Sequence, residues 1–98
     1  MKYQVEILPE AHSDIEKFMI FLSKQFISKE LLFKLRNLLY SKIYSLEYFP
    51  EIFMEVHTDY RRLLVQKYSI FYKVNNKNKT VIIYRILHQA QNFKKYLD

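Results

Sequence analysis

The spacing of apolar side chains along the chain changes twice, and each change predicts a different element. Residues 3–7 alternate apolar and polar side chains, which predicts a short strand. Two starts for a following helix are open. Pro9 suits the first turn of a helix, and Ser13 stands at capping-box spacing from Glu16. Beyond either start, apolar side chains recur at helical spacing, so we predict a helix over residues 10–26, with the stripe Ile15, Phe18, Met19, Leu22 and Phe26.

A second apolar stripe predicts a second helix over residues 29–46. Ser28 is the expected N-cap, and Glu30 in the first turn complements the helix dipole. The helix should end before Pro50, because the residue before a proline disfavours helical geometry. The stripe consists of Leu31, Leu32, Leu35, Leu38, Leu39, Ile43 and Leu46. Two helices joined by a few residues form a helical hairpin.

The second half of the chain returns to a period of two. Residues 60–65, 68–74 and 80–87 are therefore predicted strands, and the last is the most apolar and the expected central one. Residues 75–78 supply a turn rich in asparagine, which tolerates positive φ. Residues 89–98 are either a short helix or a loose end.

Together these elements predict one α+β domain over residues 1–98. Its order is β-α-α-β-β-β, a two-layer arrangement with the helical hairpin packed on one face of a mainly antiparallel four-stranded sheet.

Composition removes several function classes. The chain has no cysteine, which excludes disulfides, thiolate metal sites and cysteine nucleophiles. It also has no glycine, which argues against phosphate loops, dinucleotide sites and nucleophile elbows. We therefore expect no cofactor. No apolar run is long enough to cross a bilayer and no signal-peptide pattern is present, so we expect a cytoplasmic protein.

Histidine spacing argues against a metal site. His12, His57 and His88 are far apart in sequence, and only His12 has an acidic neighbour at helical spacing, Glu16. We expect His57 to lie in a loop. His88 ends the last predicted strand, where functional side chains are common.

Charge is concentrated in the second half of the chain. The net charge is +6, of which residues 50–98 contribute nine Lys/Arg against four Asp/Glu. Such a surface suits an anionic partner, either nucleic acid or an acidic protein segment.

Three arginines are candidates for that contact. Arg61 and Arg62 are adjacent, so on a strand they point to opposite faces, and we expect at least one to face away from the helices. Arg85 alternates with apolar residues and needs either a water-exposed end or an anionic partner, for which Asp59 or a C-terminal carboxylate is the candidate.

Four segments in the expected order resemble the RelE/ParE toxins of type II toxin–antitoxin modules. They are residues 1–14, which include Leu8-Pro9-Glu10-Ala11, residues 46–50, residues 60–74 and residues 81–93. The resemblance implies a growth-inhibiting toxin, of a kind also tied to plasmid stabilisation, that binds a cognate acidic antitoxin in a hetero-oligomer. One branch of the family cuts mRNA in the ribosome, and the other poisons DNA gyrase.

The details of the resemblance favour the gyrase branch. Where the nuclease branch has an arginine in the third strand, an arginine after the last strand and a tyrosine in the tail, this chain has Ser69, Gln89 and Phe93. Tyr96 takes the tyrosine role only if the tail register shifts. None of the three replacements supplies a cation or an ionisable hydroxyl.

The sequence therefore predicts a gyrase-poisoning, non-enzymatic toxin. A ribosome-dependent mRNA endonuclease is the alternative, and a degenerate member that binds only its antitoxin is a third. The residues expected to contact the target are Arg61, Arg62, Lys67, Arg85, His88 and Gln91. In the nuclease alternative, the catalytic set is His88, Arg61, Arg62 and Lys67.

Overall fold

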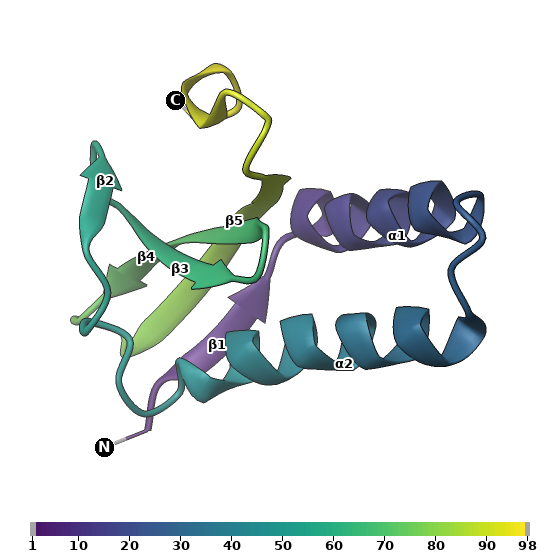
Figure 1. Ribbon diagram of the computed structural model, residues 1–98. Helices are drawn as coiled ribbons and strands as arrows, with labels where there is room; N and C mark the ends of the chain where they lie inside the picture. The colour runs from purple at the N-terminus through teal and green to yellow at the C-terminus, as the bar shows by residue number, and fades with distance from the viewer. Residues whose placement is uncertain (1, 98) are drawn as a thin grey trace.

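The computed structural model describes residues 2–97 and has the two layers expected from the sequence. Two antiparallel helices form a hairpin beside a twisted sheet (Figure 1). The elements are β1 (Gln4–Ile7), α1 (Pro9–Ser23), α2 (Lys29–Ser45), β2 (Glu55–His57), β3 (Tyr60–Val65), β4 (Tyr68–Asn75), β5 (Thr80–His88) and the 3-10 helix η1 (Phe93–Lys95). No helix within residues 2–97 is long and apolar enough to span a membrane.

The sheet has five strands in the order β1-β5-β4-β3-β2, so the expected four strands were one too few. The first strand, β1, runs parallel to β5, and the other pairs are antiparallel, with β5 next to the edge strand β1. The missed strand is β2, which contains His57, a residue expected in a loop. A strand of three residues is too short to show a period, and β2 exists only because it pairs with the start of β3.

The helix ends agree with the prediction to within one residue, except at the end of α1. Pro9 begins α1, with Leu8 as its N-cap, so the alternative start at Ser13 lies inside the helix. The predicted end at Phe26 is wrong, because α1 stops at Ser23 and Phe26 adopts φ 58°, which a right-handed helix cannot contain. Phe26 is fully exposed at 103% and so leaves the predicted stripe. At the next start, Ser28 Oγ accepts a hydrogen bond from the backbone N–H of Leu31 at 3.2 Å, as a cap.

The main core lies between the hairpin and one face of the sheet, as the stripes predict. Its buried side chains from the helices and strands are Ala11, Ile15, Leu39, Ile43, Leu46, Leu63, Val65, Tyr68, Ile70, Tyr72, Val81, Ile83 and Ile86, with Leu35 partly buried against them. A smaller cluster on the opposite face consists of Tyr60, Phe71, Leu87 and Leu97, with Phe93 of η1 packed on it. The tail therefore covers part of the second face.

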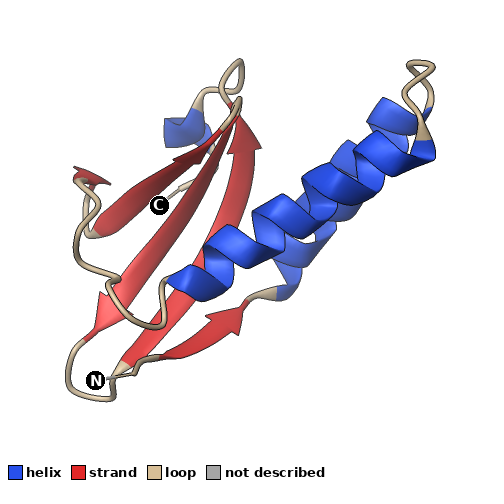
Figure 2. Ribbon diagram, turned by 60° about the horizontal axis from the view of Figure 1, so that its bottom comes forward, coloured by secondary structure: helices blue, strands red, loops and turns tan. Residues whose placement is uncertain are grey.

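The distal half of the hairpin projects past the sheet (Figure 2). There the apolar stripe has no sheet beneath it, and Ile20, Phe21, Leu31 and Phe33 are each more than half exposed. This overhang leaves apolar helical surface available to a partner.

Candidate functional site

A cavity of about 240 Å³ lies at the end of the sheet where β5 passes into the tail. Its lining combines β3, β4 and β5 with the tail residues, on the face away from the helices. The lining residues are Arg62, Ser69, Phe71, Leu87, His88, Gln89, Gln91, Asn92 and Phe93. Strand pairing sets Arg62 opposite Phe71 and Ser69 opposite Leu87. We call this the sheet-end cavity.

Arg62 is the only Lys or Arg that lines the sheet-end cavity among residues 2–97. Its Nε donates to Ser69 Oγ at 2.9 Å, and its guanidinium lies over the rings of Phe71 and Phe93, at 6.0 and 5.7 Å from their centroids. The side chain is thus held by one hydroxyl and two aromatic faces, with no carboxylate within ion-pair distance in the part of the chain that the structure describes.

His88 and Gln91 hold the turn that follows β5. The His88 N–H donates to Gln91 Oε1 at 2.8 Å, and His88 Nδ1 accepts from the Ala90 N–H at 3.1 Å. The imidazole also makes an edge contact with Tyr68, with ring centroids 5.4 Å apart. Because Nδ1 is an acceptor here, a neutral His88 carries its proton on Nε2.

The other members of the expected catalytic set lie elsewhere. Arg61 is on the opposite face of β3 from Arg62, and its Nη1 donates to the backbone oxygens of Glu51 and Phe53 at 3.1 and 2.7 Å. Lys67 is in the β3–β4 turn and lines a different groove. The structure therefore brings together His88 and Arg62 and separates them from Arg61 and Lys67.

Arg85 pairs with Asp14, which corrects the expected partner. Its Nε and Nη2 each donate to the Asp14 carboxylate at 2.8 Å, and this hydrogen bonding raises the pKa of Arg85 above its ordinary value. The candidate Asp59 lines another cavity, and the C-terminal carboxylate lies outside the described residues. Tyr96 lies over the Arg85 guanidinium at 5.1 Å and does not line the sheet-end cavity.

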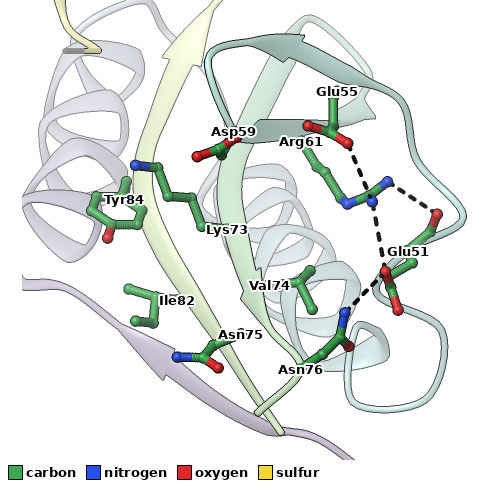
Figure 3. A pocket seen from close by; sticks show the side chains of 10 residues that line it. All are labelled: Glu51, Glu55, Asp59, Arg61, Lys73, Val74, Asn75, Asn76, Ile82 and Tyr84. Atoms are coloured by element: carbon green, nitrogen blue, oxygen red, sulfur yellow. Dashed lines mark hydrogen bonds and ion pairs between the residues drawn. The ribbon is translucent and has the colours of Figure 1, made fainter. Parts of the chain in front are cut away.

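A second cavity, of about 450 Å³, joins Arg61 and Asp59 to three charged residues that the sequence did not single out, Glu51, Glu55 and Lys73 (Figure 3). It is lined by Glu51, Glu55, Asp59, Arg61, Lys73, Val74, Asn75, Asn76, Ile82 and Tyr84. Lys73 Nζ lies 4.4 Å from the ring centroid of Tyr60 and 5.3 Å from that of Tyr84. Strand alternation could have placed Lys73 beside these tyrosines, but the carboxylates come from the loop before β2, from β2 itself and from the β2–β3 turn, a segment that carries no periodic signal.

An apolar groove of about 540 Å³ runs between the overhanging hairpin and the β3–β4 turn. It is lined by Leu22, Ile27, Leu31, Leu32, Lys34, Leu35, Leu38, Gln66, Lys67 and Tyr68. Apolar walls with two lysines at the margin suit an amphipathic segment that carries acidic side chains. We call this the hairpin groove.

Comparison with known proteins gives consistent results. A family model described as the ParE toxin of the type II toxin–antitoxin system parDE matches residues 5–93. A search of curated protein sequences found no match.

Solved structures share the fold at low sequence identity. A chromosomal ParDE system from Pseudomonas aeruginosa matches with a TM-score of 0.74 and 17% identity, over 89% of this chain and 96% of that one. The toxin–antitoxin complex RelBE2 from Mycobacterium tuberculosis matches with a TM-score of 0.65 and 17% identity, over 93% of this chain and 95% of that one. A mutant of the toxin RelE from E. coli, in the free state, matches with a TM-score of 0.63 and 15% identity, over 99% of this chain and 100% of that one.

Proposed function

Because this chain belongs to the ParE toxin family of type II toxin–antitoxin systems, we propose that it inhibits growth by poisoning DNA gyrase without catalysing a reaction of its own. The observation that carries this proposal is the content of the sheet-end cavity. It has one arginine, one histidine and no tyrosine among the described residues that line it.

Cleavage of RNA requires a group that activates the 2′-hydroxyl, a group that protonates the leaving oxygen, and a cation near the phosphate. Here the Arg62 guanidinium is already bound to Ser69, and His88 Nδ1 is used by the turn. The remaining side chains that line the cavity are three amides, two phenylalanines and one leucine, which cannot exchange a proton near neutral pH. This supports a toxin that acts by binding.

The mRNA endonuclease is retained as the alternative, because Arg62 and His88 do share one cavity. In that case His88 Nε2 would be the acid–base group and Arg62 the cation. A member that binds its antitoxin and poisons little is the third possibility.

The antitoxin partner is assigned to the hairpin groove. Its apolar walls match the nonpolar face of an amphipathic segment, and Lys34 and Lys67 match acidic side chains at the margin of that segment. Binding there would cover Leu31, the one exposed side chain of the overhang that lines the groove among the described residues.

Induction of the chain without antitoxin tests the mechanism. We expect inhibition of gyrase supercoiling and double-strand DNA breaks, with ribosome-bound mRNA intact, and His88→Gln should keep most of the toxicity. Cleavage of ribosome-bound mRNA that disappears in a folded His88→Gln variant would instead establish the nuclease. Circular dichroism of the purified variant provides the folding control, since His88 also holds the turn after β5.

A further inference from the structure

The segment between α2 and β3 has a charge opposite to the rest of the molecule. Residues 46–59 contain four Asp/Glu and no Lys or Arg, in a chain with sixteen Lys/Arg against ten Asp/Glu. Four large apolar side chains of the same segment are exposed: Tyr48 by 57%, Phe49 by 68%, Ile52 by 68% and Met54 by 77%. We call these side chains, with the carboxylates of Glu51, Glu55 and Asp59, the acidic–apolar face. The backbone of this segment runs at the opposite end of the hairpin from the α1–α2 loop (Figure 1).

The backbone beneath this face is fixed, although most of it is loop. The Pro50 carbonyl accepts from Tyr72 Oη at 2.6 Å, and burial raises the pKa of that tyrosine well above its ordinary value. Arg61 binds the next carbonyls, of Glu51 and Phe53. The apolar side chains are therefore held outward by contacts to the core of the sheet. A preformed surface loses little conformational entropy on binding, which favours affinity.

The second cavity opens within this face and retains acceptors for a cation. Glu51 and Glu55 lie 3.7 and 3.6 Å from Arg61 Nη2, with about half of each side chain exposed. The short hydrogen bonds of Arg61 go to backbone oxygens, so these carboxylates are held near the guanidinium and are not capped by it. Asp59 has no ion pair among the described residues. An incoming lysine or arginine would find several carboxylate oxygens within reach.

We propose that the acidic–apolar face is the surface that holds the target, and that it docks a basic protein surface with a Lys or Arg side chain entering the cavity beside Glu51 and Glu55. This rests on the proposed function, in which toxicity depends on binding. Charge decides the occupant. The three carboxylates of the face outnumber the two cations that line its cavity, Arg61 and Lys73, so its net negative charge repels nucleic-acid phosphates and an acidic antitoxin and attracts a basic protein. Exposed aromatic and aliphatic side chains beside a charged pocket are typical of the centre of a protein–protein interface.

Two sets of substitutions test the proposal with matched controls. The first is the triple variant Phe49→Ser, Ile52→Ser, Met54→Ser, with Ile20→Ser on the hairpin as an exposed apolar control. The second is Glu55→Lys with Asp59→Lys, for which Glu30→Lys on α2 is the exposed acidic control. Each purified full chain is examined by circular dichroism, by binding to purified DNA gyrase holoenzyme, and by growth inhibition on induction.

We expect both face variants to stay folded, to bind gyrase at least about tenfold more weakly, and to lose growth inhibition, while the controls change by less than about twofold. Unchanged toxicity in the folded face variants would overturn the proposal. So would a wild type that binds duplex DNA or RNA through this face, or a dimer in sedimentation that only the face variants dissociate. If the wild type fails to bind gyrase but both face variants still abolish its toxicity, gyrase is the wrong target and the docking face stands. A wild type without toxicity would overturn both proposals.

Discussion

Asp14 and Arg85 are 71 residues apart in the chain and joined by two hydrogen bonds of 2.8 Å. The same carboxylate accepts the backbone N–H of Ile86 at 2.9 Å. The parallel partner β1 ends at Ile7, opposite Ile83, so β5 continues without a neighbour on that side. Asp14 on α1 takes the place of the missing strand, and the first helix is thereby fixed to the sheet.

Asp14→Asn should destabilise the fold through this contact. The amide can still accept from Ile86, but Arg85 loses its only ion pair among residues 2–97. Breaking a buried pair costs about 3–5 kcal/mol, and the partial exposure of Arg85 reduces the expected loss to about 2 kcal/mol. Urea unfolding measures this loss in the free energy of unfolding. Glu16→Gln, which removes the exposed pair with Arg36, serves as the control and should change the free energy of unfolding by less than about 0.5 kcal/mol.

The adjacent arginines should differ sharply in their contribution to stability. Arg61→Ala removes hydrogen bonds to two loop carbonyls and should cost about 1–3 kcal/mol, because those carbonyls lose a charged donor. Arg62→Ala removes one hydrogen bond to a hydroxyl and should cost about 1 kcal/mol or less. Unfolding midpoints of the two variants, with limited proteolysis of residues 46–55, provide the comparison. An equal or greater loss in Arg62→Ala would refute the assignment of Arg61 as the loop anchor.

Leu31→Glu should separate toxicity from neutralisation. Leu31 lines the hairpin groove and is 57% exposed, so a carboxylate there is compatible with folding but repels an acidic antitoxin. We expect growth inhibition to persist when antitoxin is co-expressed. Phe33→Glu, on the same helix but outside the groove lining, is the matched control and should remain neutralised. If antitoxin rescues both variants equally, its binding site is not the groove.

Gln66→Gly should stabilise the protein slightly. Gln66 has φ 54° in the β3–β4 turn, a left-handed conformation that costs a residue with a Cβ atom about 1 kcal/mol. Glycine removes that cost but gains entropy in the unfolded chain, so the net gain should be about 0.5 kcal/mol. Lys67→Gly in the same turn, where φ is negative, should destabilise instead. Thermal melts of both variants show directly whether each substitution raises or lowers the melting temperature.

The fold was predictable wherever the apolar pattern was long enough to carry a period. Residues 60–65 were predicted with the observed ends, and α2 began at the expected residue beside its Ser28 cap. The short strand β2 was missed because only pairing with β3 creates it. The end of α1 was placed too late because Phe26 continues the helical spacing in sequence while its backbone has already left the helix.

The candidate site was less predictable, because side-chain partners depend on how distant segments pass one another. Strand alternation correctly separates Arg61 from Arg62. It cannot reveal that a loop carbonyl accepts a hydrogen bond from Arg61. Nor can it reveal that the partner of Arg85 is Asp14 of the first helix and not Asp59. Lys73 and the carboxylates of the second cavity come together only through the path of residues 51–59, which include the short strand β2.

The parallel pairing of β1 with β5 also has a consequence for the timing of synthesis. Translation delivers β1 before two helices and three strands and β5 after them, so every contact between β1 and β5 waits until those elements have been made. Until then the helical hairpin has no completed sheet to pack on. We therefore expect the β1–β5 pairing, and with it the complete sheet on which the hairpin packs, to form only after β5 has been synthesised.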